Sequence, residues 1–239
     1  MNVLSIGNSF SQDAQRYLHE IARACGDDVR TVNLYIGGCP LDLHYDNMKQ
    51  DARAYEIQCD GHDTGFYTSI KEALMSRKWD VVTLQQVSTK SPYIETYSPY
   101  ITELADYVRS ILPEAKIFIH QTWSYEEGSE ALAGTGFSSS LDMQREITLA
   151  YTKAAELIFA DGIIPSGEVL GILRREHRVH RDPIHASAGL GRYAIALTWY
   201  SVLLQKRLDK APDILLDEAV SNDERDCVLD AVNEVLAKY

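Results

Sequence analysis

Hydrophobic and polar positions along the chain follow two periods, which predict strands and helices in turn. Short runs of β-branched and other apolar residues, with no regular polar positions, indicate strands that are buried on both faces. Five such runs predict strands at residues 3–6, 29–35, 80–84, 116–120 and 162–164. Because each run is short and is followed by turn-forming or polar residues, we expect each strand to end in a loop.

Longer segments between these strands repeat their apolar residues every three or four positions, as amphipathic helices do. The first predicted helix covers residues 11–25 and ends at Gly26. Further helices are predicted at about residues 69–78, 98–111, 142–160, 187–207 and 222–238. The segment 187–207 is apolar on nearly every face, so we expect this helix to be largely buried.

The alternation of strands and helices predicts a parallel sheet with helices on both faces. The sequence contains no internal repeat and no low-complexity linker, so we expect a single domain over residues 1–239. Ligands of such sheets bind beyond the carboxyl ends of the strands. Polar side chains that follow the predicted strands are therefore the first candidates for a functional site.

Composition and charge exclude some classes of partner. The 239 residues include 23 basic and 35 acidic side chains, a formal net charge of −12, which argues against a nucleic-acid partner. No segment approaches the roughly 20 apolar residues of a membrane span. The four cysteines are scattered, without a CxxC pair, and the chain begins without a secretory pattern. We therefore expect reduced thiols and a cytoplasmic location.

Two separate segments contain the residue types that nucleophilic catalysis needs. Ser9, in GNSFS, lies between the first predicted strand and the first predicted helix, and Asp182 and His185 are spaced D-x-x-H before the helix at 187–207. A nucleophilic serine needs a base and an acid that orients this base. Taken alone, either segment is equally typical of an ordinary turn.

Two more segments follow predicted strands and could supply hydrogen-bond donors at the same edge. GGCP, residues 37–40, contains paired glycines whose N–H groups can face a ligand. LQQVS, residues 84–88, places Gln85 and Gln86 at the end of a buried strand, where an amide side chain needs a partner. Each segment also has a purely structural interpretation, in which it bonds only to loop backbone.

Together, the four segments resemble the sequence blocks of the SGNH (GDSL-like) hydrolase superfamily, in order and spacing over most of the chain. The resemblance implies a three-layer α/β/α fold with a five-stranded parallel sheet in the flavodoxin-like order 2-1-3-4-5. It implies a serine esterase without cofactor or metal, in which Ser9 is the nucleophile, His185 the base and Asp182 its acid. The oxyanion hole is expected from the N–H groups of Ser9 and Gly38 and from the side chain of Gln85, with Gln86 in reserve.

The sequence departs from the superfamily pattern in two blocks. Asn8 stands where an aspartate is usual, and LQQVS replaces the usual G-x-N-D. The glutamine block is similar to that of sugar acetylesterases within the superfamily. We therefore expect a small-molecule or glycan ester as substrate, most specifically an O-acetylated carbohydrate.

Four residues are candidates for contact with the substrate. Trp123 and Tyr125 follow the fourth predicted strand, and aromatic rings at such a place can stack on a sugar. Asn8 adjoins the nucleophile, and His44 lies in the long connection 36–68, which is unusual unless it shapes a site or has structure of its own.

Three alternatives stay open at this level. His177, His180, Asp182 and His185 are all potential metal ligands, although four nearby arginines disfavour a cation. A glycan-binding module on a degenerate hydrolase fold would explain the two departures. Lysophospholipase or thioesterase activity would use the same triad. The sequence does not indicate an oligomeric state.

Overall fold

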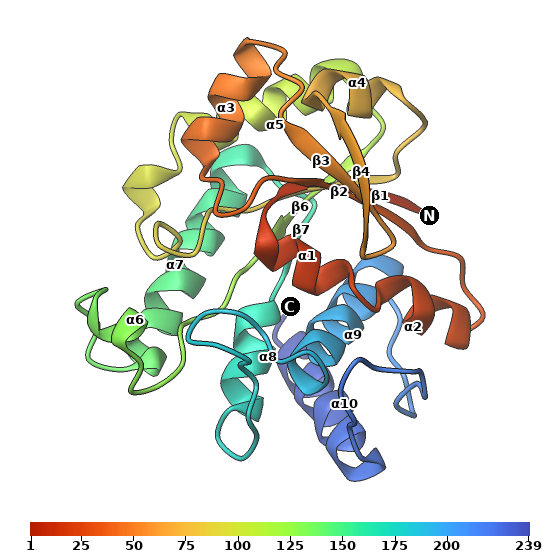
Figure 1. The fold of residues 1–239 in the computed structure, drawn as a ribbon, viewed down its shortest axis with the longest axis vertical. Coiled ribbons are helices and arrows are strands. Elements are labelled where there is room, and N and C mark those ends of the chain that lie inside the picture. The colour runs from red at the N-terminus through yellow and green to blue at the C-terminus, as the bar shows by residue number, and fades with distance from the viewer.

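The computed structural model describes residues 1–239, and one seven-stranded sheet runs through its centre between two layers of helices (Figure 1). The strand order is β4-β3-β2-β1-β5-β6-β7. The strands are β1 (Asn2–Gly7), β2 (Arg30–Tyr35), β3 (Tyr55–Cys59), β4 (His62–Thr68), β5 (Val81–Leu84), β6 (Lys116–His120) and β7 (Gly162–Ile164).

The five strands predicted from the sequence are parallel and adjacent. β1 pairs with β2 on one side and with β5 on the other, and β6 and β7 follow β5. Renumbered among themselves, these strands have the order 2-1-3-4-5, so the predicted fold class is confirmed. The carboxyl ends of all five lie at one edge of the sheet, where the loops that carry the candidate residues begin.

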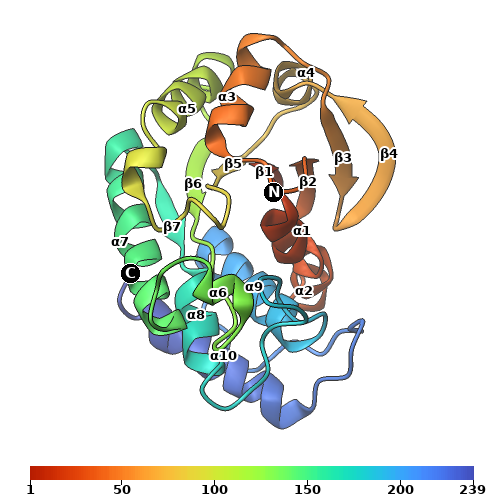
Figure 2. The same ribbon diagram turned by 60° about the vertical axis from the view of Figure 1, so that its left-hand side comes forward.

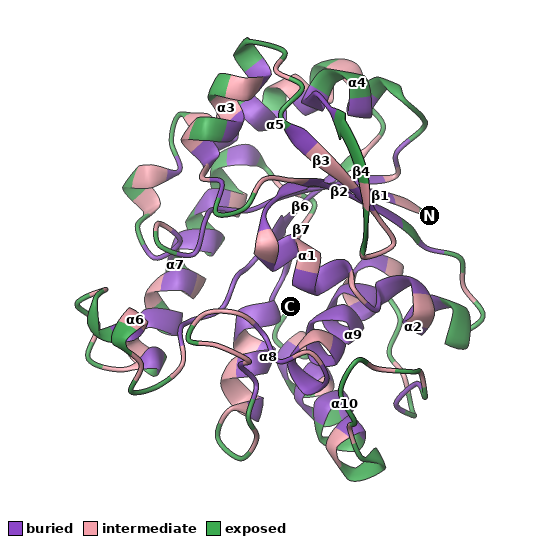
Figure 3. Cartoon of the chain, in the orientation of Figure 1, coloured by how far each residue is buried: buried purple, intermediate pink, exposed green.

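The prediction of a five-stranded sheet was wrong in one respect, because the sheet continues through two antiparallel strands. β3 pairs with β2, and β4 pairs with β3, both antiparallel. Both strands belong to the connection 36–68, and they form the outer edge seen in Figure 2. β4 is largely exposed (Figure 3). Its sequence therefore lacks the run of apolar residues that is typical of a buried strand.

Two layers of helices cover the sheet. α1 (Ser9–Gln15), α2 (Leu18–Ala24), α8 (Ser166–Leu173), α9 (Leu190–Leu204) and α10 (Asn222–Leu236) pack together on one face. α3 (Leu41–Lys49), α4 (Ile70–Met75), α5 (Tyr100–Ile111) and α7 (Ser140–Ile158) pack on the other. The short helix α6 (Glu130–Ala133) lies in the loop after β6, and a 3-10 turn covers Ile94–Thr96.

The sheet separates two apolar cores. Along β1, Val3 belongs to the core under α1, α2 and α9, whereas Leu4 and Ile6 belong to the core under α5 and α7. This alternation follows from the opposite directions of successive side chains in a strand. α9 is buried almost throughout, as its apolar sequence predicted. None of the helices combines the length and the apolar character that a membrane crossing needs.

The helix expected at residues 11–25 is in fact two helices. α1 ends at Gln15 and α2 begins at Leu18, and Tyr17 between them has a non-helical backbone. The hydroxyl of Tyr17 donates to Ala188 O and accepts from Asp217 N, which ties the break to later segments of the chain. The structure also has three helices, α3, α6 and α8, that the sequence pattern did not predict.

Candidate active site

The turn from β1 into α1 presents Ser9 at the carboxyl edge of the sheet. Asn8 caps the helix: its Oδ1 accepts from Phe10 N at 3.0 Å, and its own N–H donates to Ser11 Oγ at 3.0 Å. Gly7 is required here, because an added Cβ would lie 2.1 Å from Ser11 Oγ. Ser9 is the first helical residue, so its N–H belongs to the helix-end groups that have no partner within the helix.

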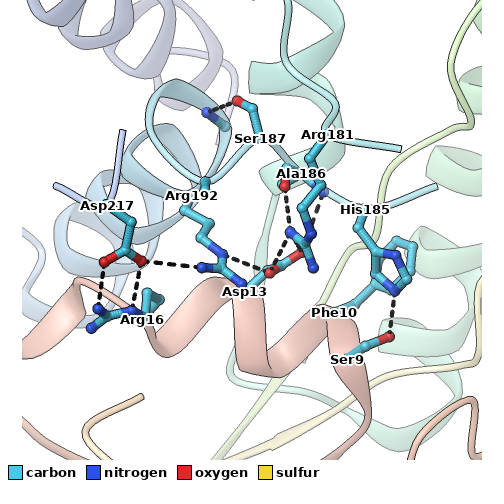
Figure 4. A network of polar contacts seen from close by, with 12 residues as sticks. Ser9, Phe10, Asp13, Arg16, Arg181, His185, Ala186, Ser187, Arg192 and Asp217 are labelled. Carbon is cyan, nitrogen blue, oxygen red and sulfur yellow. Dashed lines mark hydrogen bonds and ion pairs between the residues drawn. The ribbon is translucent and has the colours of Figure 1, made fainter. Parts of the chain in front are cut away.

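The structure brings together the three side chains expected to form a triad. Ser9 Oγ lies 3.0 Å from His185 Nε2 (Figure 4), and His185 Nδ1 lies 2.8 Å from Asp182 Oδ2. Because an ionised carboxylate only accepts, Nδ1 donates to Asp182 and Nε2 faces the serine hydroxyl as an acceptor. This is the arrangement in which a histidine can take a proton from a serine.

Asp182 is held as an anion by its own loop. Its Oδ1 accepts from the N–H groups of Ile184 at 2.9 Å and His185 at 2.8 Å. Partial burial acts to raise the pKa of Asp182, but these two backbone bonds and the His185 side chain outweigh it and lower the pKa to about 2. The carboxylate therefore stays charged and oriented toward His185 at any pH near neutrality.

Trp123 supports this loop instead of facing a substrate, so its expected role in substrate contact was wrong. Its side chain is 1% exposed, its Nε1 donates to Ile184 O at 2.9 Å, and its ring stacks on Phe10 at 4.2 Å. Next to it, Glu126 N donates to Pro183 O at 2.8 Å. The segment after β6 thus binds the middle of the loop that carries Asp182 and His185.

A cavity of about 390 Å³ opens beside Ser9 and His185. Two of the expected contact residues, Asn8 and Tyr125, line it, as does Gly38, whose φ of +62° favours glycine. Gly37, Val87 and Ser88 belong to the GGCP and LQQVS segments singled out from the sequence, whereas sequence reasoning missed Phe10, Tyr35, Thr89 and Ile184. Phe10 lies in α1, Tyr35 ends β2, and Thr89 and Ile184 lie in loops; single residues at such places give no signal of their own in one sequence.

Gln85 and Gln86 do not line the cavity, although both were candidates for the oxyanion hole. The Gln86 side chain accepts from Leu41 N and Val87 N and donates to Thr96, so all its polar atoms serve the loops. This correction removes Gln86 as the reserve donor.

Gln85 lies closer to the nucleophile and bonds to its neighbour. Gln85 Nε2 donates to Asn8 Oδ1 at 2.7 Å, and its Oε1 accepts from His120 Nδ1 at 2.8 Å. Asn8 Nδ2 in turn donates to Cys39 O at 3.1 Å, next to Gly38. These buried hydrogen bonds link the ends of β1, β5 and β6 to the turn after β2. The Asn8 side chain thus joins the backbone next to Ser9 to the backbone next to Gly38.

His44 is buried away from the cavity, so its expected contact with substrate was also wrong. It is 0% exposed, and its Nδ1 pairs with the hydroxyl of Tyr55 at 3.0 Å. Burial lowers the pKa of His44 to about 3. Cys39 packs against the same ring, and burial raises the pKa of its thiol to about 12, so this cysteine stays a neutral thiol near neutral pH.

The residues of the alternative metal site do not converge. His180 Nε2 bonds to Ser124 O at 3.0 Å, while both nitrogens of His185 serve Ser9 and Asp182. No group of three histidine, cysteine or carboxylate side chains is placed to share an ion.

The sequence analysis missed a buried ionic cluster beside the triad. Asp13, on α1, bonds to Arg181 and Arg192, and Figure 4 shows this cluster next to Ser9 and His185. One signal was present: Asp13 lies four residues before Tyr17, on the apolar face of the predicted helix, where an unpaired charge would be costly.

Comparison with known proteins shows the family to which the chain belongs. A family model described as "Domain of unknown function (DUF4886)" matches residues 2–232. The chain belongs to the DUF4886 family. The crystal structure of a DUF4886 family protein from Bacteroides uniformis is 32% identical, with a TM-score of 0.92, and the match covers 99% of this chain and 95% of that one. No curated protein matches the chain.

More distant structures share the fold of this DUF4886 chain. A protein from Slackia heliotrinireducens, provisionally described as an SGNH hydrolase, is 22% identical with a TM-score of 0.63, covering 85% of this chain and 98% of that one. A carbohydrate esterase family 3 protein from Talaromyces cellulolyticus is 13% identical with a TM-score of 0.57, covering 86% and 97%. At these identities the likeness establishes the SGNH hydrolase fold for the DUF4886 chain.

Proposed function

We propose that this protein is a serine esterase that works through an acyl-enzyme. The observation that carries the proposal is the contact of 3.0 Å between Ser9 Oγ and His185 Nε2, with Asp182 behind the imidazole and a cavity in front of the serine. The SGNH hydrolase fold supports it, because ligands of such sheets bind at the edge where these residues lie.

The reaction begins when Ser9 Oγ attacks the carbonyl carbon of an ester in the cavity. His185 Nε2 takes the serine proton, and Asp182 stabilises the imidazolium that results. The tetrahedral oxyanion is bound by the backbone N–H groups of Ser9 and Gly38. It collapses as the bond to the leaving alkoxide breaks, and His185 returns the proton to that oxygen.

Water then completes the cycle. His185 takes a proton from a water molecule, whose oxygen attacks the acyl carbon on Ser9. The bond between the acyl carbon and Ser9 Oγ breaks, a carboxylic acid leaves, and the proton returns to Ser9. No cofactor or metal takes part in any step of this scheme.

We propose an O-acetylated carbohydrate as the substrate. The cavity is small and is lined by the rings of Tyr35 and Tyr125, which fits a short acyl group with a sugar against an aromatic wall. A carbohydrate esterase is among the proteins that share the fold. Apart from His185, the residues that line the cavity carry no carboxylate, ammonium or guanidinium group, which favours a neutral substrate.

The test is hydrolysis of p-nitrophenyl acetate, with mass spectrometry after reaction with a fluorophosphonate. We expect turnover, a single adduct on Ser9, and a loss of kcat of about a thousandfold or more in Ser9→Ala and in His185→Ala. Unaltered activity in a folded Ser9→Ala variant would contradict the nucleophile. Sugar binding without turnover or adduct would instead support a glycan-binding module.

The substrate class is tested separately with acetylated oligosaccharides and with p-nitrophenyl esters of increasing chain length. We expect acetyl esters to have the highest kcat/KM and acetylated sugars to release acetate. Faster hydrolysis of long-chain esters or of acyl thioesters would support a lysophospholipase or a thioesterase, and would overturn the carbohydrate proposal while leaving the triad in place.

A further inference from the structure

Asp13 is a buried carboxylate that the proposed mechanism does not use. It lies on α1, one turn after Ser9, and its side chain is 0% exposed. Both of its oxygens accept from Arg181 Nη1 at 2.9 Å, Oδ1 accepts from Arg192 Nε at 2.8 Å, and Oδ2 accepts from Ala186 N at 3.2 Å. The helix that carries the nucleophile thus holds a fully bonded anion on its buried side (Figure 4).

The partners of Asp13 bracket the segment that carries the acid and the base. Arg181 immediately precedes Asp182, and Ala186 immediately follows His185. Arg181 also closes the segment on itself, because its N–H donates to His185 O at 3.0 Å and its guanidinium donates to Ala186 O. One carboxylate on α1 therefore binds both ends of the loop 181–186.

Other contacts hold this loop from the segment after β6, and apolar packing of Phe10 on Trp123 and His185 adds to them on the side of α1. The bonds from Trp123 Nε1 and Glu126 N reach the middle of the loop from the segment after β6. From α1, the polar contacts to the loop are the bond between Ser9 and His185, and those of Asp13. Apart from the bond between Ser9 and His185 itself, Asp13 thus makes every polar contact that fixes the loop on α1.

The cluster extends beyond Asp13 to a second carboxylate. Arg192, from α9, also donates to Asp217 at 3.3 Å, and Asp217 pairs with Arg16 at 2.6 Å just after α1. A buried ion pair often contributes less to stability than well-packed apolar side chains would, because of the cost of desolvation. A contribution to stability therefore does not explain why a buried carboxylate lies at position 13. The need for a fixed geometry between Ser9 and His185 does explain it.

We infer that Asp13 is a positioning residue for ester hydrolysis: it fixes the distance between Ser9 Oγ and His185 Nε2 by binding both ends of the loop that carries the base. The inference rests on the proposed function. A displacement of about 1 Å between reacting groups can cost on the order of a hundredfold in rate. Loss of the Asp13 charge releases the loop from α1 while all three triad side chains stay in the chain.

The test compares Asp13→Asn with the wild type in hydrolysis of p-nitrophenyl acetate. We expect kcat to fall by about tenfold or more while KM changes by less than about twofold, because the substrate cavity is untouched. The control is Asp27→Asn, which removes a carboxylate in the loop between α2 and β2, where it is bonded to Lys206 and Tyr200 away from the cavity. We expect this variant to keep the wild-type kcat.

A second background separates positioning from general damage to the fold. In His185→Ala, the base is absent, so adding Asp13→Asn should leave the residual rate unchanged. A structural defect alone would lower the residual rate by the same factor as in the wild type. Arg181→Gln keeps the carboxylate and removes its partner at the start of the loop, and we expect it to lower kcat in the same way; it decides the question if Asp13→Asn does not fold.

The outcomes are distinguishable. Wild-type kcat in folded Asp13→Asn or in Arg181→Gln, or an equal loss in the His185→Ala background, would overturn the inference and leave the esterase proposal standing. A wild type with neither turnover nor an adduct on Ser9 would overturn both.

Discussion

At the scale of single residues, the contact between Ser9 and His185 depends on partners that lie far from Ser9 in the sequence. Asp13 and Arg181 are separated by 168 positions and become partners only after folding. The arginines near the D-x-x-H segment were interpreted only as charges that disfavour a metal, because nothing in the sequence shows which acid they meet.

The two glutamines illustrate the same limit. A buried amide at a strand end was correctly expected to need partners, but its choice of partner depends on loops that the pattern does not describe. Gln85 meets Asn8, and Gln86 meets backbone groups of two loops. The departure from the superfamily pattern at Asn8 therefore belongs with the departure at Gln85, since the two side chains bond to each other.

This bond leads to a prediction for the oxyanion hole. If Gln85 acts by holding Asn8, the loss of kcat in the double variant Asn8→Ala/Gln85→Ala should be no larger than the loss in the more damaging single variant. Steady-state kinetics with p-nitrophenyl acetate measures all four proteins. Losses that multiply would instead show that Gln85 binds the oxyanion directly through its second amide proton.

At the scale of elements, buried strands were recognised and exposed or irregular ones were missed. The five parallel strands are short segments rich in β-branched and other apolar residues, whereas β3 and β4 have mixed polar sequences and form a partly exposed edge. α8 was missed because its sequence SGEVLGIL contains two glycines, which disfavour a helix. In the structure these two glycines meet very different surroundings.

The glycines of α8 predict opposite effects of the same substitution. A Cβ at Gly167 would lie 2.1 Å from Thr122 O and 2.4 Å from Gln144 Nε2, so Gly167→Ala should lower the free energy of unfolding by about 1–3 kcal/mol. A Cβ at Gly171 would meet nothing within 4 Å, so Gly171→Ala should raise it by about 0.5–1 kcal/mol. Urea unfolding of both variants checks this pair, and a stabilised Gly167→Ala protein would contradict the packing of α8 on the loop after β6.

At the scale of the whole molecule, two histidines are enclosed on opposite sides of the sheet edge. His44 lies beneath α3, and His120 ends β6 against the ring of Trp199. Burial lowers the pKa of each from 6.5 to about 3. Between about pH 3 and pH 6.5, these two histidines are therefore neutral in the folded protein and protonated in the unfolded chain.

This difference predicts a loss of stability in acid. As the pH falls below about 6.5, the unfolded chain takes up two protons that the folded protein does not, and the free energy of unfolding decreases by up to about 1.4 kcal/mol per pH unit for each histidine. The loss ends near pH 3, where the folded form is protonated too. Urea titrations between pH 7 and pH 5 measure the slope, which should be shallower in His44→Gln and His120→Gln. An unchanged slope in both variants would contradict their burial as neutral rings.

The contact between Ser9 and His185 joins positions that are 176 residues apart, and this separation matters while the chain is being made. A ribosome releases the turn of Ser9 first, and His185 emerges only after 176 further residues have been added. Until then the serine has no base, and the Asp13 carboxylate has neither of its arginines. If the esterase proposal holds, a nascent chain carries an inert serine, and the ability to cleave esters appears only once the late segment has docked onto the first helix.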